Sequence, residues 1–173
     1  QTGIGRTGKL FGFENFDCIP DVIVYGKGLG GGIPIGAFTS SKKIMDSLHK
    51  NPILGHITTF GGNPVITAAA LQTLKIVLDS ELMTNTLQYE RFIRNKLKHH
   101  LIKEIRGLGL MLCLIMKDSE TADKLVLKAK EKGLILFWLL IEKRAVRITP
   151  PLTISKKELS EGCNIILDLL DTI

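Results

Sequence analysis

One lysine of the chain, Lys27, stands where a short apolar strand opens into a glycine-rich stretch. The preceding residues 22–25 are β-branched or aromatic, a composition typical of a strand buried on both faces. Desolvation in a half-buried place disfavours the ammonium form and lowers the pKa of a lysine. Such an amine is a nucleophile that can form a Schiff base with an aldehyde. The neighbouring glycines let the backbone approach a bulky ligand closely, so Lys27 is the candidate catalytic residue.

The same glycines also fit a nucleotide-binding loop. Gly26-x-Gly28-x-x-Gly31 has the spacing of the dinucleotide fingerprint, directly after a strand. That fingerprint requires a helix to begin at once, whereas residues 32–38 contain a proline and two glycines and predict another extended segment. No Gly-Lys-Ser/Thr follows, which excludes a P-loop. A nucleotide-binding module that uses the loop Gly26–Gly32 stays the alternative.

Four blocks of the sequence resemble the class III aminotransferases of the ornithine and acetylornithine type, in that family's order and spacing. They are residues 1–13 with Gly-Arg6-Thr-Gly, residues 20–37 around the lysine, residues 56–64 with Thr-Thr-Phe-Gly-Gly-Asn-Pro, and Arg147-Ile-Thr-Pro-Pro-Leu152. The resemblance covers the whole chain but only the C-terminal part of the family's sequence. Because the chain also begins inside a motif, we expect a fragment that is incomplete by itself.

The resemblance implies an α/β fold, the C-terminal part of a fold-type I transferase that depends on pyridoxal 5'-phosphate. It implies a transaminase that moves an amino group from acetylornithine to 2-oxoglutarate by a ping-pong mechanism; ornithine, lysine and 4-aminobutyrate stay open as donors. The cofactor is the electron sink, so the protein supplies few chemical parts. The family further implies a homodimer with shared active sites. A non-catalytic remnant of an aminotransferase is a second alternative.

Five residues stand at positions to which the resemblance gives roles. Lys27 matches the Schiff-base lysine, whose freed amine then serves as general base, and Gln1 matches a glutamine that hydrogen-bonds the cofactor's phenolic oxygen. Thr59 matches a threonine that binds the phosphate of the neighbouring subunit's cofactor, and Thr58 a residue that touches substrate. Arg147 matches an arginine near the substrate carboxylate, for which a guanidinium fork is suited. Structural roles stay open as alternatives: the two threonines could simply form a turn, and the arginine could simply bridge the two domains.

The composition bears on whether the chain binds nucleic acid, a membrane or a metal. The net charge is +6, but the lysines are dispersed among acidic residues and aromatic residues make up only 6%, which argues against a nucleic-acid surface. No apolar run approaches the roughly 20 residues of a membrane span. Cys18, Cys113 and Cys163 are odd in number and lack metal-ligand spacing, so we expect inert buried thiols in a reducing cytoplasm and no metal site.

A change in the pattern of predicted elements near residue 81 predicts two domains. The resemblance implies that residues 1–81 are the end of a large cofactor-binding domain and that residues 82–173 form a small C-terminal domain. A capping box at Ser155 and Glu158 predicts the start of the last helix. An asparagine and a proline, Asn63 and Pro64, predict the start of a long and largely buried one. The other expected elements are strands at 21–25, 35–39, within 105–115, at 134–139 and 146–148, and helices at 41–49, 84–101 and 119–132.

Overall fold

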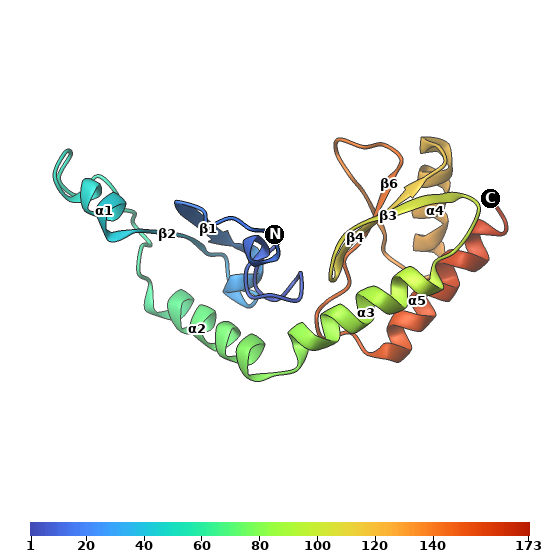
Figure 1. The fold of residues 1–173 in the computed structure, drawn as a ribbon, viewed down its shortest axis with the longest axis horizontal. Helices are drawn as coiled ribbons and strands as arrows, with labels where there is room; N and C mark the ends of the chain where they lie inside the picture. Colours follow the sequence, from blue (N-terminus) through green and yellow to red (C-terminus); the bar gives the residue numbers. More distant parts are fainter. The chain divides into compact units, whose positions relative to one another are not determined.

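A computed structural model describes residues 1–173, which form two compact units (Figure 1). The first unit comprises Gln1–Ile4 and Lys9–Glu81, and the second comprises Gly5–Gly8 and Leu82–Ile173. None of the helices combines the length and the apolar character that crossing a bilayer requires.

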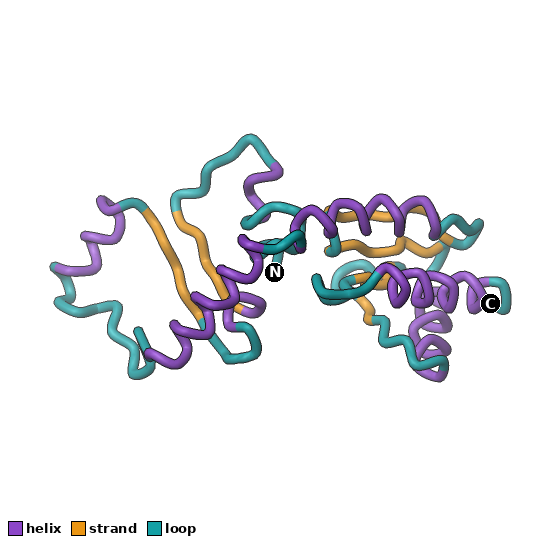
Figure 2. Tube along the Cα trace, turned by 90° about the horizontal axis from the view of Figure 1, so that it is seen from below, coloured by secondary structure: helices purple, strands orange, loops and turns teal.

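The first unit is built on two antiparallel strands, β1 (Val22–Gly26) and β2 (Gly36–Ser40). Figure 2 shows them as a lone pair of strands. Between them lies a single 3-10 turn, η2 (Lys27–Gly30), which ends at Gly31 in a left-handed conformation with φ of 60°. An earlier 3-10 turn, η1, covers Gly12–Asn15. The expected strand at 35–39 is confirmed to within one residue.

The prediction that β1 is buried on both faces is wrong. Val24 is 79% exposed, whereas Tyr25, on the other face, packs its ring 5.5 Å from the ring of Phe11. The physical reason is the two-stranded sheet, because β2 is the only strand beside β1. One face of the strand therefore stays open to solvent.

The helices of the first unit are α1 (Lys42–Met45), continued by the 3-10 turn η3 (Asp46–His49), and the longer α2 (Pro64–Asp79). The predicted start of α2 is confirmed, since the Asn63 side chain accepts hydrogen bonds from the backbone N–H groups of Val65 and Ile66. The expected burial of α2 is wrong. Its apolar residues are covered mainly where η2 packs against it, so only Ala70 and Val77 are buried.

The second unit contains a four-stranded antiparallel sheet in the order β3-β4-β6-β5. The strands are β3 (Ile102–Leu108), β4 (Met111–Met116), β6 (Ala145–Ile148) and β5 (Phe137–Trp138). The strand β5 is shorter than the predicted 134–139. The first residues of the predicted strand instead follow the end of the preceding helix, because the Leu134 N–H donates to the carbonyl oxygen of Ala129.

Three helices pack on this sheet: α3 (Leu82–Lys96), α4 (Ser119–Glu131) and α5 (Lys156–Leu170). The capping box of α5 is confirmed: Ser155 Oγ accepts from the Glu158 N–H at 3.2 Å, and the Ser155 N–H donates to Glu158 Oε2 at 2.9 Å. Helix α3 ends five residues before the predicted residue 101, and the chain turns there into β3.

Alternate residues of the strands face opposite ways. The face of the sheet under the helices carries the core residues Leu112, Leu114 and Val146, which are almost fully buried together with residues of α3, α4 and α5. The opposite face carries a row of directly paired residues, one from each strand: Arg106, Cys113, Arg147 and Phe137. The second unit therefore has a complete core on one face and a charged row on the other.

Candidate active site

Lys27 is the first residue of η2, directly after β1, and has a positive φ of 49°. Its side chain is exposed rather than half-buried, since only β2 flanks the strand that it follows. The side chain makes no hydrogen bond or ion pair with another residue. Its ε-amine is therefore free to meet a ligand.

Glycines allow the turn after Lys27 to lie close to its neighbours. A Cβ at Gly31 would collide with Thr73 Oγ1 of α2, and the φ of this residue is +60°. At Gly32, where φ is +108°, nothing lies within 4 Å of the place a Cβ would take. The turn is thus pressed against α2 at Gly31 and has open space at Gly32.

Gln1 is exposed, and the segment that it begins runs beside the lysine turn. Ile4 Cβ lies 4.0 Å from the position of a Cβ on Gly28, and the Ile4 N–H donates to the carbonyl oxygen of Leu10 at 2.6 Å. The structure therefore brings the segment 1–4 next to the turn that carries Lys27.

Thr58 and Thr59 are exposed and lie in the loop before α2. The carbonyl oxygen of Thr58 accepts from the Gly61 N–H at 3.1 Å, which forms a turn. The hydroxyl and the N–H of Thr59 have no partner in the chain. Both groups are therefore available to an anion at the N-terminus of a helix.

No hydrogen bond or ion pair joins Thr59 to Lys27. The lysine turn packs against α2 at Ala69 and Thr73, which lie roughly 8 Å and 14 Å along the helix axis from its first residue. The threonines precede that first residue. The two predicted cofactor-binding elements of the first unit thus lie at different places along α2.

Arg147 lies in the second unit, on β6, and is half-buried. Its guanidinium carbon is 5.8 Å from the centre of the Phe137 ring, which is directly paired with it across the sheet. The guanidinium donates no hydrogen bond within the chain, so its N–H groups are free. No carboxylate of the chain lies within ion-pair distance of Arg147. Sequence reasoning missed Phe137, because an apolar residue in a strand carries no signal of its own.

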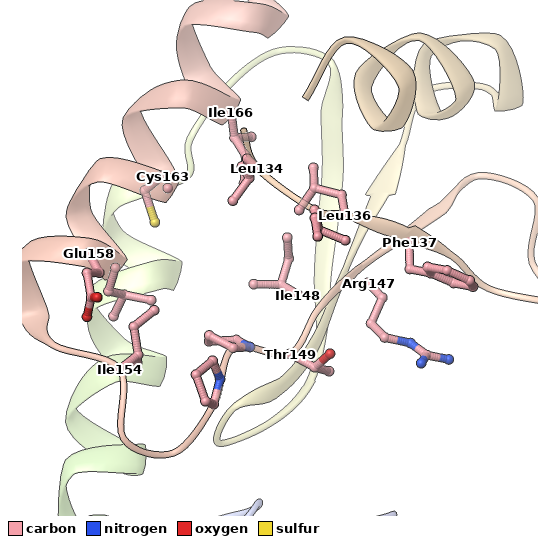
Figure 3. A pocket seen from close by; sticks show the side chains of 15 residues that line it. Leu134, Leu136, Phe137, Arg147, Ile148, Thr149, Ile154, Glu158, Cys163 and Ile166 are labelled. Carbon is pink, nitrogen blue, oxygen red and sulfur yellow. The ribbon is translucent and has the colours of Figure 1, made fainter. Parts of the chain in front are cut away.

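A cavity of about 460 Å³ lies beside β6 in the second unit, between the strand and α5. Its wall is mainly apolar, with Leu134, Ile148 and Ile154 among the residues that line it. Figure 3 shows the side chains of Arg147 and Phe137 pointing away from its interior. Burial raises the pKa of the Cys163 thiol in the wall to about 11. Arg147 thus borders the cavity, with its guanidinium turned outward.

No group of three or more His, Cys, Asp or Glu side chains in residues 1–173 could hold a metal ion. The nucleotide-binding alternative finds no support either. The loop Gly26–Gly32 holds one 3-10 turn, and the chain then enters an antiparallel strand instead of the helix that a dinucleotide fold requires.

Known proteins resemble the chain over its whole length. Residues 1–170 match the family described as aminotransferase class-III. The chain is 40% identical to the acetylornithine aminotransferase of Caldanaerobacter subterraneus subsp. tengcongensis, over 100% of this chain and 44% of that protein. It is 41% identical to the leucine/methionine racemase of Thermococcus litoralis, over 94% of this chain and 38% of that protein.

A solved structure agrees with these sequence matches. The acetylornithine aminotransferase of Elizabethkingia anophelis superposes with a TM-score of 0.88 at 34% identity, over 100% of this chain and 44% of that one. The chain thus spans less than half the length of these relatives. Its fold is a part of the fold-type I architecture of aminotransferases that depend on pyridoxal phosphate. The chain belongs to the class III aminotransferase family.

Proposed function

We propose that the polypeptide carrying this chain is an aminotransferase that moves an amino group from acetylornithine, or a related amino acid, to 2-oxoglutarate. The family match over residues 1–170, with an unengaged lysine at the junction of strand and glycine turn, is the observation that carries the proposal. We further propose that residues 1–81 end the cofactor-binding domain, that residues 82–173 form the small domain, and that the enzyme works in the cytoplasm as a homodimer.

The residues present fit pyridoxal 5'-phosphate. The ε-amine of Lys27 is free and would hold the cofactor's aldehyde carbon, and the exposed carboxamide of Gln1 would donate to its phenolic oxygen. The free hydroxyl and N–H of Thr59 are donors for a phosphate and add no titrating group. When bound, the cofactor supplies the electron sink that makes the substrate's carbon acidic.

Two residues would act on the substrate. The ε-amine of Lys27 would serve as the base that takes a proton from the carbon bearing the amino group and later returns a proton to the product. Arg147 would bind the carboxylate through two parallel N–H donors, because these donors make no hydrogen bond within the chain. Thr58, next to the phosphate-binding threonine, would touch the substrate.

The arrangement along α2 supports a role for Thr59 in a second copy of the chain. The lysine turn packs against the middle of α2, whereas Thr59 stands before its first residue. A threonine at that place can serve the phosphate of a neighbouring subunit, while Lys27 serves the cofactor of its own.

The test is made on the complete polypeptide that carries residues 1–173. Lys27→Ala should abolish amino transfer from acetylornithine to 2-oxoglutarate, whereas Lys43→Ala, which removes an exposed lysine of α1, should leave it unchanged. Reduction of the wild type with borohydride should place the mass of the cofactor on the peptide that contains Lys27. Labelling of another lysine, or full activity of Lys27→Ala, refutes the assignment.

The racemase of 41% identity makes amino-acid racemisation a second candidate. A racemase inverts leucine or methionine without any keto acid, and an aminotransferase does not turn over unless an amino acceptor is present. Loss of optical activity in the absence of 2-oxoglutarate would favour racemisation and count against the proposed transfer.

A further inference from the structure

Arg6 joins two loops of the second unit. Its Nη1 donates to the carbonyl oxygen of Pro150 at 2.5 Å and to that of Leu110 at 3.2 Å. The Leu110 N–H donates back to the carbonyl oxygen of Arg6 at 3.0 Å. Side chain and backbone of one residue thus hold both the β3–β4 turn and the segment that follows β6.

The segment Gly5–Gly8 is seated without free space. At Gly109, where φ is +59°, a Cβ would lie 2.6 Å from the carbonyl oxygen of Arg6 and 2.8 Å from Thr7 Cα. A Cβ at Gly8 would lie 2.5 Å from Leu87 Cδ2. Thr7 is 4% exposed. Because neither glycine leaves room for a Cβ, the segment packs closely against the β3–β4 turn and against α3.

The guanidinium of Arg6 makes these bonds without a carboxylate partner. It is half-buried, and desolvation lowers its pKa. Both acceptors of Nη1 are backbone carbonyl oxygens, one of them only three residues beyond Arg147. A charge-assisted bond to a carbonyl oxygen is directional and strong, so it fixes the atom that accepts it.

The chain after β6 has few other means to hold its position. Pro150 and Pro151 lack a backbone N–H and cannot extend the ladder to a neighbouring strand. The strand ends at Ile148, which pairs with Leu112 of β4. The hydrogen bond from Arg6 therefore holds the chain directly after the last residue of β6 that pairs in the sheet. This place lies close in sequence to Arg147, to which the proposed function assigns the substrate carboxylate.

We propose that Arg6 is a positioning residue for Arg147, which selects substrates that carry a carboxylate. By fixing Pro150 and the β3–β4 turn, Arg6 sets the end of β6 and with it the direction of the Arg147 guanidinium. This inference rests on the proposed function, because it assigns to Arg147 the carboxylate of the substrate.

The experiment compares Arg6→Met, Arg6→Lys and Arg147→Met in the complete polypeptide, with Arg91→Met as the matched control. Arg91 is an exposed arginine of α3 without a partner, so its removal takes away the same charge in the same unit. The first readout is the Kd of glutarate, a non-reacting five-carbon dicarboxylate, measured by calorimetry on cofactor-free protein. The second is the single-turnover rate with acetylornithine and with putrescine, a diamine that has no carboxylate.

Arg6→Met should raise the Kd of glutarate about tenfold and lower the single-turnover rate with acetylornithine in proportion. The single-turnover rate with putrescine should equal that of the wild type. Arg6→Lys should lie between, because an ammonium keeps the charge and the N–H donors but lacks the fixed planar geometry of the guanidinium. Arg91→Met should change neither readout. Arg6→Lys serves as the second variant should Arg6→Met fail to fold.

Equal losses with acetylornithine and putrescine, or an unchanged Kd of glutarate in both Arg6 variants, would overturn the inference. An unchanged Kd in Arg147→Met would also overturn it, because Arg147 would then not bind the carboxylate. The proposed amino transfer fails separately, by full activity of Lys27→Ala.

Discussion

Lys27 and Arg147 each carry a positive charge that no carboxylate of the chain neutralises. Other cations of the second unit are engaged locally: Lys124 lies 2.6 Å from Glu120, and Arg94 Nε lies 2.9 Å from Glu90. Such pairs orient a side chain but occupy its donors. A basic group left free at the end of a strand can instead meet a ligand. We propose that the guanidinium of Arg147 meets an anion and that the amine of Lys27, once it has lost its proton, meets an electrophile.

The two residues differ in how far the sequence alone could describe them. The glycine pattern around Lys27 is local, so the residues themselves indicated its place at the end of a strand. The cation–π contact of Arg147 with Phe137 depends on the pairing of β5 with β6, and the bonds of Arg6 join segments more than a hundred residues apart. Contacts of that kind come from the tertiary fold and leave no local pattern.

The three cysteines should differ in reactivity. The prediction that all are buried is wrong, because Cys18 lies exposed between η1 and β1, outside any core, while Cys163 is 3% exposed. With a pKa raised by burial to about 11, fewer than about one Cys163 thiol in a thousand is ionised at pH 7.5. Iodoacetamide should therefore alkylate Cys18 first and Cys163 only in denaturant, as followed by peptide mass spectrometry. Equal labelling rates in the native protein would contradict this.

At the scale of elements, the structure follows the sequence where local chemistry decides. Asn63 and Ser155 cap α2 and α5 as predicted, because capping depends on residues within one turn. The burial of β1 and the length of β5 were predicted wrongly. Both depend on which elements lie beside the strand, and a hydrophobic run looks the same whether it is covered or not.

The cap of α5 can be measured. Ser155→Ala removes the acceptor for the Glu158 N–H and should lower the free energy of unfolding of the second unit by about 1 kcal/mol. Urea denaturation followed by circular dichroism measures this loss. Ser160→Ala, within the same helix, is the control and should change stability far less. Equal effects of the two substitutions would show that the cap contributes nothing particular.

The same cap gives a pH dependence with a definite sign. Hydrogen bonds from Ser155 lower the pKa of Glu158 from its ordinary value of 4.5. The carboxylate therefore stabilises the folded state fully above about pH 4.5, and this contribution is lost as the pH falls through the lower pKa of the folded state. The difference in unfolding free energy between wild type and Glu158→Gln should thus be present at pH 7 and shrink below pH 4.5. A difference that grows on acidification would contradict it.

At the scale of the whole molecule, the two units differ in how much of their apolar surface they bury. The second unit has a closed core, whereas the buried apolar residues of the first unit are Leu29, Ala70 and Val77. Many large apolar side chains of the first unit are more than half exposed: Phe16, Ile19, Val24, Ile53, Leu54, Ile57, Phe60, Val65, Leu71, Ile76 and Leu78. Surface of this kind is ordinarily covered by other protein.

The 173-residue chain by itself should therefore associate and lack amino transfer. Both edges of a two-stranded sheet and the apolar residues around it are open to other copies. Sedimentation velocity should show large, concentration-dependent species, and Val24→Lys should reduce them because it places a charge on the exposed face of β1. A monodisperse and active 173-residue monomer would refute this expectation.

The proposed sharing of sites between two subunits can be decided by mixing variants of the complete polypeptide. Thr59→Ala removes a hydroxyl bond to a charged phosphate, worth roughly 1.5–3 kcal/mol, so it should weaken cofactor affinity about ten- to a hundredfold. At a cofactor concentration that saturates the wild type but not this variant, Thr59→Ala and Lys27→Ala homodimers should both be nearly inactive. The activity of their mixture then reports how the lesions are distributed.

If Thr59 serves the partner's cofactor, a heterodimer of the two variants has both lesions in one site and an intact second site. Activity should then return after mixing and subunit exchange. If each subunit completes its own site, every heterodimer has one lesion in each site and the mixture stays inactive.

The control experiment mixes a Lys27→Ala/Thr59→Ala double variant with wild type. When sites are shared, the heterodimer has no intact site. When sites are separate, it has one intact site. Shared sites therefore require recovered activity in the first mixture and, in the second, activity below that of the same amount of wild type alone. The opposite pair of results would exclude them.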